Sequence, residues 1–266
     1  MRWRWLAVLV VICVFMGVTR AQQTANSMPV RDWRGMLVLQ QAVQAAGGLR
    51  AIDAVQSYSA SGRITFYWTE DGTEGDLIMK GRGVHDFRLD AHMANGIEEW
   101  WAIKDWSGFK KEADGRVRYL PSQELANIQS LCSPRAQLAN AILDSRVAVT
   151  FLGTHAREGR TSFGIRIRSA NAPSGPGDIG GKLSEKDFYI DAQTFQITTV
   201  EDFSYPRENI AGGIRRRITF ADYRNVDGTF FPFSISEQVG KRRRLMEIRL
   251  TEVSINVPIT DHDFMP

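Results

Sequence analysis

Apolar and polar residues alternate along most of this chain, and that alternation constrains its fold more than any other feature. Ile64, Phe66 and Trp68 stand at every second position, with Thr65 and Tyr67 between them. A period of two is typical of strands that bury one face in a core. Segments with this period follow one another at short intervals, and short connections join antiparallel neighbours. The pattern predicts about ten or eleven strands in antiparallel order.

Two regions break the alternation with helical spacing. Apolar residues within 36–46 recur at intervals of three and four and end at Gly47-Gly48, which predicts a helix with a glycine stop and a short continuation. A second apolar stripe lies within 121–144. Ser133-Pro134 divides it, because serine is a good N-cap and proline is tolerated at the first helical position. We therefore expect two consecutive helices in the middle of a β-protein.

These elements predict an α+β chain that is mainly β. We expect a single antiparallel sheet, with an N-terminal helix and with the helical pair in the middle of the chain. The Gly- and Pro-rich stretch 172–182 predicts a loop. No repeat and no second boundary interrupts 34–266, which we expect to form one domain. About 240 residues are enough for one large core.

The N-terminus has the pattern of a secretory signal. Arg2 and Arg4 precede an apolar stretch, 6–18, and small residues follow it up to Ala21. A bilayer-spanning helix needs roughly 20 apolar residues, so the stretch is short for an anchor. We expect residues 1–21 to be cleaved on export; a retained N-terminal anchor is the alternative. The polar residues 22–33 predict a disordered lead-in.

Removing this signal changes what the composition implies. Arg2, Arg4 and Arg20 account for the whole formal net charge of +3, so the mature chain is close to neutral and no nucleic-acid partner is expected. Cys13 lacks the small preceding residues of a lipidation site, so no stable membrane anchor is expected. Cys132 is then the single cysteine of the mature chain, and we expect a buried thiol rather than a disulfide.

Motifs for catalysis, cofactors or metals are missing from the sequence. No stretch has the spacing of a phosphate-binding loop, and no Gly-x-Ser-x-Gly motif for a hydrolase nucleophile occurs. Glu98 and Glu99 are neighbours on an expected strand, so they point to opposite faces and cannot act as a carboxylate pair. The Asp-His-Asp cluster at 261–263 is explained by a solvated chain end better than by a metal. We expect no cofactor, no metal site and no enzymatic activity.

A hydrolase is the enzymatic alternative that the sequence leaves open. Cys132 could act as a nucleophile only with a base beside it, and the candidates are His155 and His262. The four histidines lie far apart and lack the spacing of metal ligands. Nothing in the sequence brings a base to the thiol, so a packed thiol is the simpler interpretation.

Two basic runs, 215–217 and 241–244, lie at or near expected hairpin ends. Solubilising charge that discourages contact between sheet edges explains both runs. The alternative is a local patch for anionic head groups or for an acidic protein partner, which a neutral chain can still carry. The sequence favours the first interpretation.

Large aromatic side chains are numerous for one sheet. Core packing accounts for most of them. A curved sheet with a helical pair across its concave face would nevertheless leave a long apolar cleft between the two layers. Such a cleft suits an acyl chain.

The order of several segments resembles the LolA/LolB-like family, the periplasmic outer-membrane lipoprotein-sorting proteins and their relatives. The matching features are the export signal, the helix that ends at Gly47-Gly48, and the segments AVQSYSASGRITF (54–66), LIMKGRGVHDFRLD (77–90), YRNVDGTFFPFSISE (223–237) and INVPITDHDFMP (255–266). The resemblance covers most of the mature chain, and it lies in the order of the segments more than in any one of them.

This resemblance implies an incomplete antiparallel barrel wrapped over helices, with an interior that receives lipid acyl chains. It also implies a strand arginine that holds the lid helices closed, and the corresponding residue is Arg82. The lid is the helical pair, 125–142. The residues expected to line the cleft and lid are Ile64, Phe66, Trp68, Leu77, Met79, Trp101, Leu125, Ile128, Leu131, Leu138 and Ile142.

We therefore expect a soluble, monomeric periplasmic carrier for lipidated proteins or other acyl-chain cargo, with lipoprotein acyl chains or lipid as its ligand. The alternative is a non-catalytic regulatory or scaffold module of the envelope that binds a protein partner through its basic hairpins. An open cleft would favour the carrier, and a cleft filled by side chains would favour the scaffold.

Overall fold

The structure is a computed structural model of the 266-residue chain. It describes residues 29–83, 85–105, 107–112, 114–132, 134–157, 159–169, 179–206, 212–241 and 243–266. The signal predicted at 1–21 and most of the lead-in predicted at 22–33 lie outside these residues. Among the described residues, no helix is both long and apolar enough to cross a membrane.

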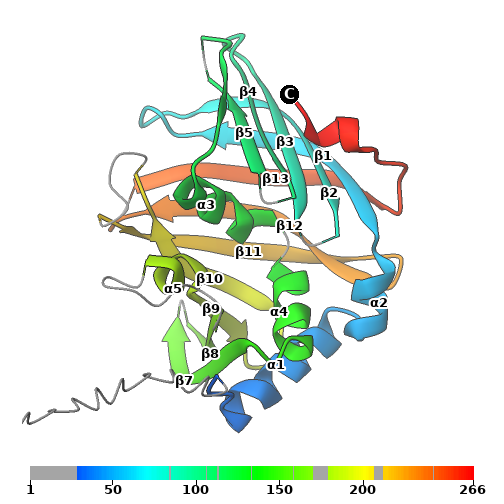
Figure 1. The fold of residues 1–266 in the computed structure, drawn as a ribbon, viewed down its shortest axis with the longest axis vertical. Helices are drawn as coiled ribbons and strands as arrows, with labels where there is room; N and C mark the ends of the chain where they lie inside the picture. Colours follow the sequence, from blue (N-terminus) through cyan, green and yellow to red (C-terminus); the bar gives the residue numbers. More distant parts are fainter. Residues whose placement is uncertain are drawn as a thin grey trace, which may run out of the picture.

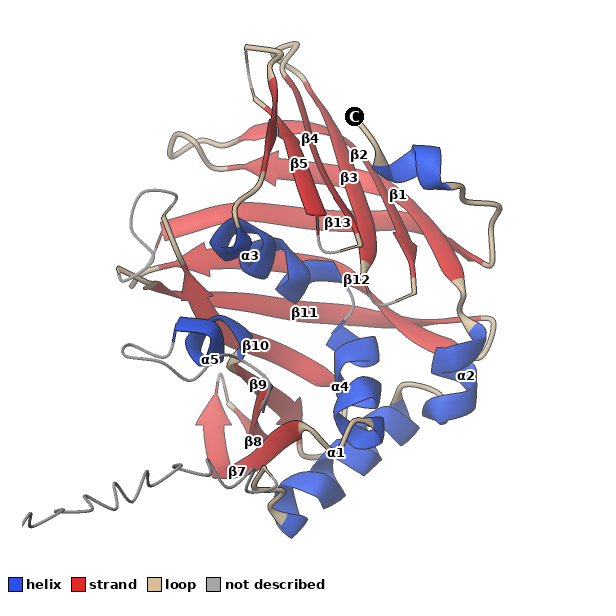
Figure 2. Cartoon of the chain, in the orientation of Figure 1, coloured by secondary structure: helices blue, strands red, loops and turns tan. Residues whose placement is uncertain are grey.

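Thirteen strands in the described part of the chain form one antiparallel sheet (Figure 1, Figure 2). They are β1 (Ser57–Phe66), β2 (Thr73–Arg82), β3 (Asp86–Met93), β4 (Glu98–Lys104), β5 (Ser107–Lys111), β6 (Val117–Tyr119), β7 (Val147–Arg157), β8 (Arg160–Ser169), β9 (Lys186–Asp191), β10 (Ile197–Ser204), β11 (Ile214–Val226), β12 (Thr229–Val239) and β13 (Arg243–Ile255). The mainly β, single-sheet class predicted from the alternation is confirmed.

The sheet has more strands than the ten or eleven expected, and β5 is one that the alternation does not predict. Its five residues carry one large apolar side chain, Phe109, so no alternation can be recognised. Gly108 leaves room for α3 (Ser122–Cys132) on β5, because a Cβ at that position would lie 2.3 Å from a methyl group of Leu125. The glycine thus lets a helix that crosses the sheet pack directly on the strand.

The described helices are α1 (Trp33–Ala45), α2 (Gly48–Ala54), α3 (Ser122–Cys132), α4 (Pro134–Leu143), α5 (Ile179–Ser184) and the 3-10 turn η1 (Asp261–Phe264). The N-terminal helix and the break between α3 and α4 lie where the sequence predicts them. The prediction of a loop over 172–182 is wrong at the C-terminal end of this range, because α5 begins at Ile179. Glycine pairs disfavour helices, so contacts of α5 with β8 and α3 override the local preference.

Strand order explains why a helical pair interrupts the β-protein. The order is β6-β5-β4-β3-β2-β1-β13-β12-β11-β10-β9-β8-β7, so β1 and β13 pair in the middle while β6 and β7 form the two edges. The chain must therefore cross the whole sheet between β6 and β7, and α3 and α4 make that crossing over one face (Figure 1). Leu131 of α3 and Leu138 of α4 are buried in the core.

Arg31 fixes the C-terminal end of α4. Its guanidinium donates hydrogen bonds to the carbonyl oxygens of Asp144 at 2.7 Å and Ala141 at 2.8 Å. Its backbone pairs with Val149 at the start of the β7 edge. A cation near the last carbonyls of a helix is in its favourable position. This part of the predicted lead-in therefore holds the helical pair at one end.

Candidate functional site

A cavity of about 520 Å³ lies between α2, α4 and the adjoining ends of β1 and β2. We call it the α4 pocket. Its lining residues are Leu49, Arg50, Ile52, Asp53, Val55, Gln56, Ser57, Tyr58, Gly81, Gly83, Arg135, Ala136, Ala139, Asn140 and Leu143. Leu49 and Leu143 are exposed, whereas Arg135 and Ala139 are buried, so the pocket runs from an exposed rim to a buried floor.

Gly81 shapes one wall of the α4 pocket. A Cβ at this position would lie 2.1 Å from the Tyr58 ring, so glycine is needed for the ring to lie against β2. The Tyr58 ring in turn packs edge-on against Phe231, with the ring centroids 5.9 Å apart. The wall is thus built from three neighbouring regions of the sheet, and local sequence alone does not define it.

A second cavity, of about 270 Å³, lies under α3. We call it the α3 pocket. It is lined by Phe66, Tyr67, Trp68, Glu99, Trp101, Lys110, Leu120, Glu124, Asn127, Ile128, Leu131, Ser204, Arg216, Glu237, Leu245 and Met246. Stacked rings of Phe66 and Trp68, with centroids 5.2 Å apart, form an aromatic wall, and Trp101 meets Phe66 edge-on at 6.0 Å.

Packed side chains separate the two pockets. Between them lies a void of about 30 Å³, which is lined by Tyr58 and Arg135 from the α4 pocket and by Leu131 from the α3 pocket. The space beneath the helical pair is therefore open at both ends and nearly filled in the middle. Joining the two pockets would require these three side chains to move.

The predicted lining residues divide between these spaces and the core. Five of them, Phe66, Trp68, Trp101, Ile128 and Leu131, line the α3 pocket. Met79 and Leu131 line the void in the middle, and Leu138 lines a smaller void of about 10 Å³ beside α1. Ile64 and Leu77 are buried in the core, while Leu125 and Ile142 are partly buried against it. No predicted lining residue belongs to the α4 pocket, the larger of the two.

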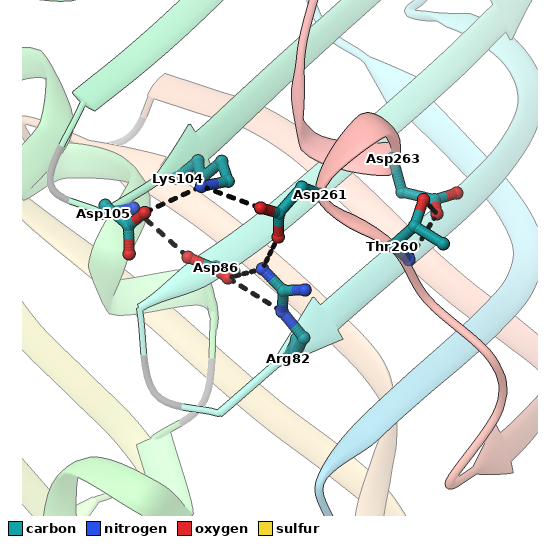
Figure 3. Close-up of polar contacts among 7 residues, drawn as sticks. All are labelled: Arg82, Asp86, Lys104, Asp105, Thr260, Asp261 and Asp263. Carbon is teal, nitrogen blue, oxygen red and sulfur yellow. Dashed lines mark hydrogen bonds and ion pairs between the residues drawn. The ribbon is translucent and has the colours of Figure 1, made fainter.

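Arg82, the predicted latch, lies among polar residues near the C-terminal turn (Figure 3). It donates to Asp86 at 2.6 Å and 3.0 Å and to Asp261 of η1 at 2.7 Å. Lys104 also pairs with Asp261, at 3.4 Å. None of these partners belongs to the helical pair. In the described chain, Arg82 therefore fastens η1 to β2 and β3.

The same turn contains the acidic cluster considered for a metal. Asp263 accepts hydrogen bonds from Lys80 at 2.6 Å and from the Thr260 backbone at 2.8 Å, and these contacts hold the pKa of its carboxyl well below the ordinary value. Asp261 is taken up by Arg82 and Lys104. Within the described ranges, no group of three metal-ligating side chains occurs. Cationic neighbours satisfy these carboxylates.

Arg216 connects the sheet with α3. Its guanidinium, 2% exposed, binds Asp202 with two hydrogen bonds at 2.6 and 2.7 Å and reaches Glu237 at 3.3 Å. It also donates to the carbonyl oxygen of Asn127 in α3, and Ser130 of α3 donates to Asp202. Arg216 and its partner Asp202 thus contact α3, whereas the Arg82 contacts described above are with Asp86 and Asp261.

The surroundings of Arg216 favour its charged form, but they favour the charged form of Glu237, its second acidic partner, less. Burial alone would lower the pKa of Arg216, but the charge of Asp202 beside it raises that pKa above its ordinary value. Burial raises the pKa of the Glu237 carboxyl despite its contact with Arg216. One guanidinium serves two carboxylates here, and the bidentate bonds go to Asp202.

The first basic run is therefore not a uniform patch. Arg215 and Arg217 are exposed and both pair with Glu201, at 2.6 and 2.9 Å. Arg216 between them faces the core. Strand parity could have revealed this difference, because Arg216 shares its face with the buried Ile218. In the second run, Arg244 contacts Glu247 at 3.0 Å.

Arg135 is the second buried arginine, and it lies in the first turn of α4 with 7% of its surface exposed. Its Nη1 donates to the carbonyl oxygen of Phe230 at 2.8 Å and to the Thr229 hydroxyl at 3.4 Å. Its guanidinium carbon lies 3.5 Å from the centre of the Phe231 ring. Burial lowers the pKa of Arg135 to about 10.

Of the residues considered for catalysis, Glu98, Glu99 and His155 have contacts or burial that the structure describes, whereas the side chain of Cys132 lies outside the described residues. Glu98 pairs with Lys111 at 2.7 Å on the surface, while Glu99 is buried in the α3 pocket, so the two point to opposite faces as predicted. Burial raises the pKa of Glu99. The ring of His155 packs edge-on against Tyr189, at 5.3 Å, and its Nε2 has no hydrogen-bond partner among the described residues.

Comparisons with known proteins place the fold. The sequence matches no protein-family model and no curated protein. Among solved structures, a domain from Vibrio parahaemolyticus described as an outer membrane lipoprotein-sorting protein is 12% identical, with a TM-score of 0.53 over 87% of this chain and 96% of that domain.

Two further solved structures are similar to the same extent. A DUF1329 family protein from Desulfovibrio piger is 11% identical, with a TM-score of 0.53 over 86% of this chain and 96% of that one. A LolA superfamily protein from Nitrosomonas europaea is 10% identical, with a TM-score of 0.54 over 87% of this chain and 97% of that one. At such identities the likeness establishes the fold alone: this chain has a LolA-like fold, as the resemblance in its sequence predicts.

Proposed function

We propose that this protein is a non-catalytic binding or carrier protein for acyl-chain cargo, either lipidated proteins or lipids, and that it works as a monomer in the periplasm after export. The observation that carries the proposal is the α4 pocket, a largely apolar cavity of about 520 Å³ with an exposed rim between the helical pair and the sheet. Ligand pockets of proteins commonly measure about 300–1,000 Å³.

The energy available from such a pocket is sufficient for a carrier. Burial of a methylene group contributes about 0.8 kcal/mol. Ten buried methylenes therefore contribute about 8 kcal/mol before the cost of immobilising the chain, which limits the affinity to about the micromolar range or weaker. Reversible binding in that range suits a protein that must release what it carries.

The nearly filled middle limits how a long chain could extend under the helical pair. Cargo longer than one pocket would have to displace Tyr58, Leu131 and Arg135 or separate α3 from the sheet. The contacts of Arg216 with Asn127 and Asp202 oppose that separation. We propose that these contacts, rather than those of Arg82, hold the lid closed.

The test is lipid binding by the purified mature protein. We expect a fluorescent fatty acid to bind, and we expect mass spectrometry of protein purified natively from the envelope to detect a lipid or a lipoprotein. Ala136→Trp would fill the α4 pocket and weaken binding. Ala221→Trp, an exposed position on β11, is the matched control and should bind normally. Absence of both co-purifying lipid and fatty-acid binding would refute the proposal.

The partner-binding alternative would use the exposed Arg215 and Arg217. Both already pair with Glu201, so their charge is largely compensated on the strand beside them. Replacing these two residues by glutamate while leaving Arg216 intact tests the alternative without disturbing the core. Loss of a protein partner in a pull-down, with fatty-acid binding unchanged, would favour the scaffold over the carrier.

A further inference from the structure

Arg135 lies at the inner end of the α4 pocket. It lines this pocket and also both small voids beneath the helical pair, so it belongs to the floor and not to the rim. Its known contacts use Nη1 and one face of the guanidinium, which covers the Phe231 ring. An arginine side chain carries five N–H donors. Among the described residues, nothing accepts a hydrogen bond from Nε or Nη2 of Arg135.

The charge of Arg135 is also uncompensated. No carboxylate in the described ranges forms an ion pair with it, in contrast to the two carboxylates around Arg216. The acidic member of the pocket lining, Asp53, is exposed. A buried cation without an anion carries a large desolvation cost. The position adds to that cost, because the first turn of a helix is at the positive end of its dipole.

A buried, unpaired guanidinium with free donors is suited to one class of ligand group, an anionic oxygen group. An acyl chain that entered methyl end first would place its uncharged end against the cation and leave the donors unused. An amphiphile that enters head first would place its carboxylate or phosphate against Arg135. Its chain would then lie along Ile52, Val55 and Leu143 towards the rim.

We infer that the α4 pocket binds a single-chain amphiphile with an anionic head group, head first, and that Arg135 pairs with that head group. The inference rests on the proposed function and names its ligand class. The shared chemistry is a charged oxygen group on one acyl chain; a free fatty acid and a monoacyl phosphate both supply it. A double- or triple-chain lipid does not match a pocket of about 520 Å³ with the charge at its floor.

The experiment compares three probes on the purified mature protein by displacement of a fluorescent fatty acid. The probes are hexadecanoic acid, hexadecyl phosphate and methyl hexadecanoate, which keeps the chain but has no charge. We expect the acid or the phosphate to bind at least about tenfold more tightly than the ester, because a charge-assisted hydrogen bond pair contributes that much. The stronger of the two anions identifies the head group.

Two arginine variants test whether Arg135 causes the preference for an anionic head group. Arg135→Met keeps much of the side-chain volume but removes the charge, and we expect it to abolish the preference for the anion while the ester binds within about twofold of wild type. Arg146→Met is the matched control, since Arg146 is exposed and does not line the pocket. Solvent screens an exposed charge, so the preference should persist in that variant.

The outcomes separate the inference from the proposed function. Equal binding of acid, phosphate and ester to the wild-type protein would refute the inference and leave the carrier proposal intact. Binding of none of the three would refute both. Because the comparison of probes uses the wild-type protein, it is decisive even if Arg135→Met does not fold, and Arg135→Lys then supplies a variant that keeps the charge with fewer donors.

Discussion

Arg135 and Arg216 are both buried under the helical pair, and their surroundings are opposite. Arg216 has Asp202 and Glu237 beside it and a carbonyl oxygen of α3 as a further acceptor. Arg135 has one carbonyl oxygen, one hydroxyl and an aromatic ring, with no carboxylate among the described residues. The first arrangement satisfies its charge within the protein, as a structural link should. The second leaves the charge without a counter-ion among the described residues and places the residue in the lining of a cavity, as a binding site should.

This difference shows that burial of a charge does not by itself indicate its role. The same residue type stabilises a lid when anions surround it and selects a ligand when they are absent. Each of the following predictions separates these two roles, either by removing one arginine, by changing the acids of one site, or by altering a third arginine that lies outside both.

Arg216→Met should have the largest effect on stability. The substitution leaves Asp202 and Glu237 buried without a counter-ion, which typically costs about 3–5 kcal/mol. Urea denaturation followed by circular dichroism measures the change. Arg217→Met, an exposed neighbour on the same strand, is the control and should cost less than about 1 kcal/mol. Similar losses in the two variants would show that the buried cluster does not hold the lid.

Arg135→Met should be much milder. The substitution removes a cation that no acid compensates, so the desolvation cost that disappears offsets the lost hydrogen bond to Phe230. We expect the free energy of unfolding to change by less than about 1.5 kcal/mol in the absence of ligand. A loss of unfolding free energy as large as that of Arg216→Met would show that Arg135 stabilises the fold rather than serving ligand binding.

Glu237→Gln should have a smaller effect that depends on pH. Burial raises the pKa of the Glu237 carboxyl in the folded protein, so the fold favours its protonated form. Its contribution to stability is therefore present at low pH and is lost as the pH rises through the folded pKa, beginning above the ordinary value of 4.5. Glutamine keeps the neutral form at every pH.

The measurement is the difference in urea midpoint between Glu237→Gln and wild type at pH 4 and pH 7. We expect the urea midpoint of the variant to increase relative to that of wild type as the pH rises from 4 to 7. The comparison with wild type cancels the titration of other groups. If the urea midpoint of the variant instead decreases relative to that of wild type as the pH rises, the charged form of Glu237 strengthens the Arg216 cluster.

Arg82→Gln should have the smallest effect. Arg82 and its partners lie at a partly exposed turn, where an ion pair contributes little, and we expect the melting temperature to fall by no more than about 3 °C. Fatty-acid binding should remain unchanged, because Arg82 has no described contact with the helical pair. Altered binding or release of lipid in this variant would instead identify Arg82 as the latch.

Much of the architecture follows from local pattern. The period of two predicts an antiparallel sheet and most of its strands, and the apolar stripe with its Ser-Pro break predicts α3 and α4. The aromatic wall of the α3 pocket is also predictable, because Phe66 and Trp68 share one face of β1 and its continuation. These features depend on spacing within one segment, and spacing can be recognised without knowledge of the fold.

The two buried arginines belong to these patterns, although the spacing of apolar residues alone does not single them out. Arg216 stands at the same parity as the buried residues of β11, and Arg135 stands at helical spacing from Leu131 and Leu138 within the apolar stripe. A charged residue on a buried face is a signal that sequence patterns do contain. Whether it marks a lid contact or a ligand site depends on which acids come close, and those lie about a dozen or more residues away along the chain.

The sequence by itself determined the strands, the helical pair and the apolar face that each element presents, since these depend on the period of polar and apolar residues over a few turns. The tertiary structure alone decided that the helical pair crosses from β6 to β7, that the α4 pocket opens beside α2, and that Arg216 meets two carboxylates while Arg135 meets none among the described residues. The physical reason is that compensation of a buried charge depends on distances between segments, which the curvature of the sheet and the path of the crossing helices set.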